Sequence, residues 1–165
     1  MTRILLLYAA ARKVILDSVE KRGKKGYFFM YADEPIFTNV KPSEVLAVFG
    51  DTIQAEIPIA EIIEEARRNF NIFVIWPQGG YAHAKQQYIK LFGEEFVLES
   101  QHPNLLCELI ASTVGLYEDK ATPDSVVTDL VAYGVSAHEA RALVHKTAHI
   151  GASLATSGAG KAARL

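Results

Sequence analysis

The chain has 165 residues, half of them hydrophobic, and a formal net charge of −2. This is the usual size of one domain with a real core, and the small charge excludes a global electrostatic attraction to nucleic acid or to anionic membrane. The single cysteine, Cys107, excludes a disulfide within the chain and a zinc site made of cysteines. We therefore expect a cytoplasmic protein with neither nucleic-acid nor membrane partners.

The N-terminal segment predicts a helix. Residues 3–22 contain many good helix formers, no glycine or proline, and apolar residues at helical spacing. Gly23 follows two basic residues, as expected where a helix ends. The apolar stretch is too short to span a bilayer, and no small-residue cleavage region follows it. We predict one helix over residues 3–22, with a strand starting at Ile4 as the alternative.

The stretch Lys24–Pro35, KKGYFFMYADEP, predicts the central strand of the fold. Its near-continuous apolar and aromatic run is typical of a strand covered on both faces, and we place that strand at 26–32. Ligands of open α/β sheets bind beyond the carboxyl ends of the strands, where Asp33 and Glu34 lie. An ionic or metal-linked site is expected there first. The alternative is a plain turn, because acidic residues before proline often only end a strand.

The middle of the chain alternates predicted strands and helices. The clearest amphipathic helix is 58–70, with apolar residues at i, i+3, i+4 and i+7 and charged residues on the other face. The other elements are a loop at 33–41, a helix at 42–50, a linker at 51–57, a strand at 72–76, a loop at 77–80, a helix at 83–92, a strand at 96–98 and a helix at 103–115. Right-handed crossovers then predict an α/β fold, a three-layer Rossmann-like domain with a short parallel sheet flanked by helices.

The character of the chain changes after Glu118. Helices are predicted at 123–133 and 136–149, separated by Gly134, and together they form a C-terminal helical hairpin. The remaining segment is rich in small residues and glycine, which predicts a flexible tail. The expected domains are thus an α/β domain over 1–118, a hairpin over 119–150 and a tail over 151–165.

The histidines offer weak metal candidates. His138, His145 and His149 fall near one face of the last predicted helix, and a pair four residues apart can chelate a metal. No acidic general base lies between them, so surface histidines are the preferred interpretation. His102 precedes Pro103 at the end of the third predicted strand, where a loop ligand would lie.

Other candidate residues for chemistry do not assemble into a catalytic set. Gly79 and Gly80 could bring backbone N–H groups to an anion at the next helix, although a tight turn is the simpler interpretation. SGAGK at 157–161 resembles a phosphate loop but lacks a strand before it. Cys107 lies in an apolar-periodic stretch, which favours a buried structural thiol over a nucleophile. Since no nucleophile, base and orienting group come together, we do not predict an enzyme.

Three stretches together resemble a known family: LYAAARKVILDSVEKRGKKGYFFMYADEP, FNIFVIWPQGG and LCELIASTVGLYE. They are similar to the second half of a von Willebrand factor A (VWA) domain of the intracellular bacterial or phage type. In that family the central strand ends in a Thr-Asp-Gly-like turn, which residues 31–34 match, and the last helix has a pattern that residues 106–117 match. The resemblance covers about 1–118 and implies a Rossmann-like module for protein–protein interaction.

The resemblance also implies a metal-ion-dependent adhesion site, in which Asp33 matches the family's aspartate. The chain contains no DxSxS turn, so we expect the site to be a remnant that binds Mg²⁺ or Mn²⁺ weakly, if it binds a cation. We also expect the chain to lack the family's N-terminal half. The strand at 26–32 then becomes a sheet edge, to be completed by a protein partner or by another copy.

Two alternatives remain open at this point. One is a small Rossmann-like enzyme domain that binds a nucleotide or a phosphate with Asp33, Gly79, Gly80 and His102 at its strand ends. The other is a purely structural subunit whose sheet edge is completed by a strand of another chain.

Overall fold

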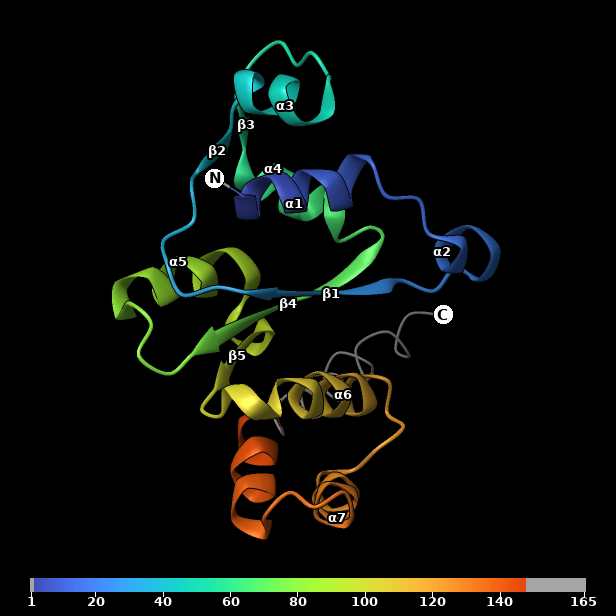
Figure 1. The fold of residues 1–165 in the computed structure, drawn as a ribbon. Coiled ribbons are helices and arrows are strands. Elements are labelled where there is room, and N and C mark those ends of the chain that lie inside the picture. Colours follow the sequence, from blue (N-terminus) through green and yellow to red (C-terminus); the bar gives the residue numbers. More distant parts are fainter. Residues whose placement is uncertain (1, 148–165) are drawn as a thin grey trace, which may run out of the picture. The chain divides into compact units, whose positions relative to one another are not determined.

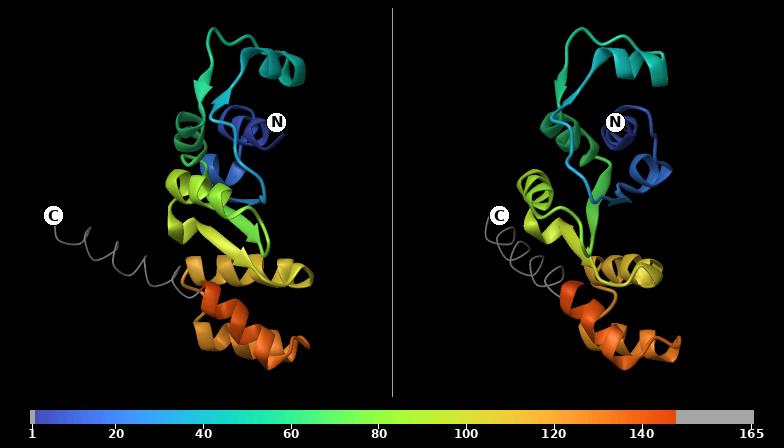
Figure 2. Two further views of the ribbon diagram at one scale, coloured as in Figure 1. Left: turned by 90° about the vertical axis from the view of Figure 1, so that its left-hand side faces the viewer. Right: turned by 60° about the vertical axis from the view of Figure 1, so that its left-hand side comes forward.

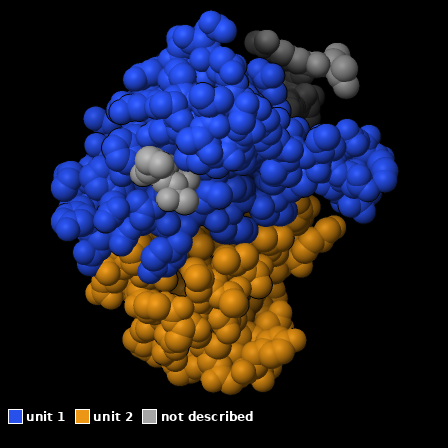
Figure 3. Space-filling view, turned by 45° about the horizontal axis from the view of Figure 1, so that its top comes forward, with its two compact units in different colours: residues 1–74, 79–97 blue, residues 75–78, 98–165 orange. Residues whose placement is uncertain are grey.

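The computed structural model describes residues 2–147. The chain divides into two compact units, residues 1–74 with 79–97 and residues 75–78 with 98–165 (Figure 3). The predicted domain boundary at residue 118 stays a prediction. The predicted tail at 151–165 and His149 lie outside the described residues.

A parallel sheet of three strands makes this an α/β fold, as predicted (Figure 1). Its strands are β1 (Gly26–Tyr31), β4 (Phe70–Pro77) and β5 (Val97–Ser100), in the order β1-β4-β5. The middle strand β4 is buried throughout residues 72–76, as its apolar sequence predicts. In β1 only Met30 is buried, while Tyr27, Phe28 and Phe29 are half-buried. The difference arises because, among residues 2–147, β1 pairs with a strand on one side only.

Three helices of the first unit follow from the apolar pattern. They are α1 (Thr2–Arg12), α4 (Ile59–Ala66) and α5 (Ala82–Phe92). α4 packs against α1 and buries the residues that the periodicity selected, Ile59, Ile62, Ile63 and Ala66. α5 buries Ala84, Tyr88 and Phe92, which lie four residues apart on one face.

The predicted single helix over 3–22 is wrong, because the chain leaves the helix after Arg12. The amides of Lys13 and Val14 both donate to the carbonyl of Ala9, at 2.8 and 3.0 Å, and end α1. Leu16 is extended, and a second helix, α2 (Asp17–Arg22), follows it. The side chain of Leu16 lies against Gly26 at the start of β1, 2.8 Å from where a Cβ on that glycine would be. Packing between distant residues therefore overrides the local helix pattern.

A small antiparallel ribbon occupies segments that were predicted to be loop and linker. β2 (Asn39–Val40) pairs with β3 (Ile57–Pro58), and α3 (Pro42–Phe49) lies between them in the sequence. The pairing is extended by Asn39, whose Nδ2 donates to Glu56 Oε2 at 2.9 Å. Strands of two residues are too short to show a sequence period, so the pattern could not reveal them.

Aromatic rings link the strands of the first unit. Phe73 of β4 is fully buried and stacks on Phe29 of β1, with ring centroids 5.3 Å apart. It also contacts Tyr27 at 6.4 Å and Phe96 at 5.5 Å. The four rings form an aromatic ladder that holds β1 on β4 through side chains as well as through the backbone.

The second unit is mostly helical, as Figure 2 shows in yellow to red. After the turn η2 (Pro103–Leu105) it contains α6 (Leu106–Tyr117), α7 (Pro123–Ala132) and a helix over 137–147. Thr122 and Ser125 form a reciprocal capping box at the start of α7. The two last helices are joined through Gly134, which adopts a φ of 94°, and they match the predicted hairpin. No helix among residues 2–147 is long and apolar enough to cross a bilayer.

Candidate functional site

The carboxyl end of β1 carries an ion-pair cluster. An Nη2 atom of Arg3, in the first turn of α1, lies 2.6 Å from Oδ1 of Asp33. Its Nη1 atom lies 3.6 Å from Oε2 of Glu34. The two carboxylates that were predicted to mark a site therefore contact the same guanidinium. It belongs to Arg3, 30 residues before Asp33 in the sequence.

Helix α5 is tied to the same strand end. The hydroxyl of Tyr88 donates to the backbone carbonyl of Glu34 at 3.1 Å, and the amide of Tyr81 approaches the carbonyl of Asp33 at 3.4 Å. Burial raises the pKa of the Tyr88 phenol, although the nearby Arg3 opposes the shift. The turn at Gly79 and Gly80 thus comes next to Asp33, as expected for two loops at the carboxyl ends of adjacent parallel strands.

The side chains of this cluster do not fit a divalent cation as they are arranged. Asp33 already accepts a charge-assisted hydrogen bond from Arg3, and an incoming Mg²⁺ would have to displace that cation. Among residues 2–147, no group of three or more His, Cys, Asp or Glu side chains could hold a metal ion. Asp33 as a remnant ligand for Mg²⁺ or Mn²⁺ stays a prediction.

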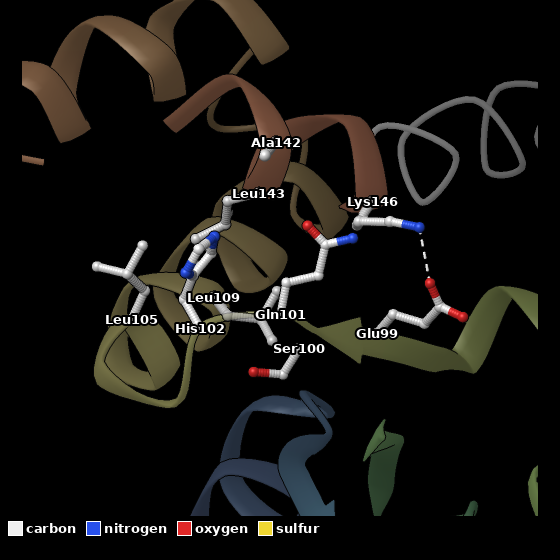
Figure 4. Close-up of a pocket in the computed structure, with 9 residues that line it drawn as sticks. All are labelled: Glu99, Ser100, Gln101, His102, Leu105, Leu109, Ala142, Leu143 and Lys146. Atoms are coloured by element: carbon white, nitrogen blue, oxygen red, sulfur yellow. Dashed lines mark hydrogen bonds and ion pairs between the residues drawn. The ribbon is translucent and has the colours of Figure 1, made fainter. Parts of the chain in front are cut away.

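His102 lies in the second unit and lines a small hollow (Figure 4). The hollow has a volume of about 20 Å³, room for one water-sized group. At its rim Lys146 Nζ pairs with Glu99 Oε2 at 2.7 Å. Because Asp33 and the two glycines belong to the first unit, His102 does not join them within one unit. The nucleotide- or phosphate-binding alternative gains no support from this hollow.

The other predicted histidines lie on the surface. His138 and His145 are both exposed on the helix over 137–147, which agrees with the preferred interpretation of surface histidines.

Cys107 is exposed, and the prediction of a buried thiol is wrong. The apolar stretch around it forms α6, whose buried face consists of Leu109, Ser112, Thr113 and Leu116. Cys107 lies on another face and lines a groove of about 480 Å³ in the second unit. The groove is also lined by Glu108, Ala111, Ser112, Gly115, Ala121, Val126, Asp129, Leu130 and Tyr133. The sequence analysis predicted no groove here, because it took the apolar stretch around Cys107 as a sign of burial.

The open edge of β1 is the second feature of the strand. β1 pairs with β4 on one side, and among the described residues no strand pairs with its other side. From Gly26 to Tyr31 the strand has no charged residue and no proline, the two features that most often protect a sheet edge. Charges stand only at its ends, with two lysines before the strand and two acidic residues after it.

No family model, no curated protein and no solved structure matches this chain. The resemblance to VWA domains therefore stays a prediction. What the protein does has to be inferred from the geometry of its own residues.

Proposed function

We propose that the protein is a protein–protein interaction module that binds a partner strand along the open edge of β1. One observation carries the proposal: β1 is a six-residue edge strand without any charge or proline. A strand that pairs on one side only presents backbone N–H and C=O groups on the other. An extended segment of another chain can take up these groups by adding a strand to the sheet.

The side chains of β1 support this function. Tyr27, Phe28 and Phe29 are half-buried and Tyr31 is 44% exposed, so an added strand would cover aromatic surface. Aromatic side chains contribute strongly to cross-strand contacts and to interfaces. The aromatic ladder to Phe73 holds the strand in place before a partner arrives, which lowers the entropy cost of binding.

In this proposal the cluster of Arg3, Asp33 and Glu34 holds the end of the edge strand β1 in position. Its ion pairs join α1 to the strand end, and the hydrogen bond from Tyr88 joins α5 to it. These contacts fix the point at which β1 stops and the chain turns away. A VWA-type ancestry with an incomplete adhesion site agrees with such a role, and so does a cytoplasmic setting without nucleic acid. Both remain part of the proposal.

The binding test uses the full chain and two matched tyrosine variants. Tyr31→Lys adds a charge at the end of the edge strand, and Tyr133→Lys adds the same charge at a tyrosine that is 89% exposed in the second unit. Each protein is screened against a random peptide library, and amide hydrogen exchange locates the bound peptides. We expect peptides that protect the β1 amides of the wild type, because edge amides lose their contact with water when a strand is added.

The two variants should separate the edge from the rest of the surface. Tyr31→Lys is expected to weaken peptide binding about tenfold or more, since a lysine on an edge disfavours strand addition, while Tyr133→Lys binds like the wild type. Peptides that bind equally well to Tyr31→Lys, or that protect amides outside β1, would overturn the proposal.

A further inference from the structure

The charged residues before β1 and those after it have opposite signs, so two antiparallel copies of the strand are complementary in charge. Lys24 and Lys25 precede the strand, and Asp33 and Glu34 follow it. When two such strands run antiparallel, the basic start of each lies beside the acidic end of the other. We infer that the partner strand is β1 of a second copy of this chain, an inference that rests on the proposed function of the edge. The two copies would join their sheets into one continuous sheet.

One register satisfies all these charges. If a twofold axis runs through Phe29 perpendicular to the sheet, then Tyr27 lies opposite Tyr31 within the paired strands. Lys24 and Lys25, just before the strand, then lie beside Asp33 and Glu34, just after the strand of the other copy. A slip by one residue turns the side chains to opposite faces of the joined sheet. A slip by two residues in either direction leaves at least one lysine opposite an uncharged residue or the proline at 35. The pairing of opposite charges and the matching of side-chain faces therefore favour the same register.

The charged residues are free enough to form these pairs. Lys24, Lys25 and Glu34 are exposed, and Asp33 is half-buried. The side chain of Glu34 is 66% exposed, and its contact with Arg3 is long, at 3.6 Å. Glu34 can therefore pair with a lysine of the second copy while Asp33 keeps its shorter bond to Arg3. Opposite charges directly across two strands stabilise the pairing, and like charges there destabilise it.

The same geometry gives a test with two single substitutions. In Lys24→Glu, two glutamates face each other at both ends of the dimer, and in Glu34→Lys two lysines do. Mixing the variants places a glutamate opposite a lysine at both ends again. Sedimentation equilibrium measures the dissociation constant of the wild type, of each variant and of the equimolar mixture. Two exposed substitutions away from β1, Lys120→Glu and Glu61→Lys, control for the change in net charge.

We expect a wild-type dimer, a dissociation constant about tenfold higher for each β1 variant alone, and recovery of most of that loss in the mixture. The control variants should dimerise like the wild type. Circular dichroism establishes that every variant is folded, so weak association cannot be ascribed to unfolding.

Failure of this inference differs from failure of the proposed function. A wild type that stays monomeric while library peptides still protect β1 contradicts the second copy and leaves the binding edge intact. A dimer that neither substitution weakens, or that mixing does not restore, also contradicts the inference. A monomer whose β1 binds no peptide contradicts both.

Discussion

At the residue scale, Arg12 and Glu65 form a bidentate ion pair in the first unit. Arg12 Nε and Nη2 donate to the two carboxylate oxygens of Glu65 at 2.7 and 2.8 Å, joining the end of α1 to α4. The guanidinium also lies over the ring of Tyr8, 5.3 Å from its centroid. The hydrogen bonds from Arg12 lower the pKa of Glu65, because they favour its charged form.

This pair predicts a pH-dependent contribution to stability. A carboxylate whose pKa is lowered by folding stabilises the folded state above its unfolded pKa, and this contribution is lost as the pH falls through the folded pKa. Glu65→Gln should lower the free energy of unfolding by about 1 kcal/mol at neutral pH, the upper range for a partly exposed bidentate pair. The difference from the wild type should shrink as the pH falls through the lowered pKa of Glu65 and should disappear below it.

Urea unfolding at neutral pH and at several acidic pH values measures the free energy of unfolding of the wild type and of Glu65→Gln, with Glu61→Gln as the control. Glu61 is an exposed residue of the same helix. A difference between wild type and Glu65→Gln that stays constant with pH would mean that the pair acts through packing and not through charge.

The sequence could not predict which side chain contacts Asp33 and Glu34. The position of Asp33 and Glu34 at a strand end followed from the apolar run that precedes them. Their partner Arg3 lies 30 residues from Asp33, on a different element, and no local pattern connects them. The exposure of Cys107 was missed for a similar reason, since a run of apolar residues does not say which face of a helix is covered.

At the element scale, the predictions were right where an amphipathic pattern or an apolar run marks the element. The amphipathic pattern placed α4, and the apolar runs placed β1 and β4, to within a few residues. They were wrong where a distant contact decides the local structure. The break between α1 and α2 depends on the packing of Leu16 against Gly26, and the ribbon of β2 and β3 depends on a pairing across α3.

The contact between Leu16 and Gly26 leads to a prediction about the break. A Cβ added at Gly26 would lie 2.8 Å from Leu16 Cδ1 and 3.3 Å from the ring of Phe70. Gly26→Ala should therefore destabilise the protein by about 1 kcal/mol, the lower end of the usual cost of overpacking, because the end of the Leu16 side chain can shift. In a Leu16→Ala background most of this cost should disappear, because the closest atom has been removed. The destabilisations should thus be clearly less than additive.

Thermal or urea unfolding of the two single variants and the double variant measures this coupling. Additive destabilisations would contradict the account of why the N-terminal segment forms two helices instead of one.

At the scale of the whole molecule, the sequence anticipated the class of fold and the edge position of its apolar strand. The class of fold follows from the order of the elements, because strands joined by helices form a parallel sheet. The edge position was expected only from the resemblance to VWA domains, with the family's N-terminal half taken as missing. In our proposal a second polypeptide closes that edge, and the charges at the two ends of β1 are the sequence feature that favours a second copy of this chain.

An unprotected edge is a liability for the molecule unless it has a partner. A flat apolar edge recruits strands without specificity and leads to aggregation. Pairing in a closed twofold dimer uses the β1 edges of both copies at once and leaves neither β1 free for a third copy. In such a dimer the charged residues on either side of β1 favour one register and disfavour the others.

The most direct test of the central claim is amide hydrogen exchange of β1 over a range of protein concentrations, with the mass measured on the same samples. Amides of β1 that do not bond to β4 should exchange rapidly in dilute samples and become protected in step with the dimer fraction, while amides of β4 stay protected throughout. If the exchange of β1 does not change while the mass doubles, or if the mass never changes, then a second copy does not pair with this edge.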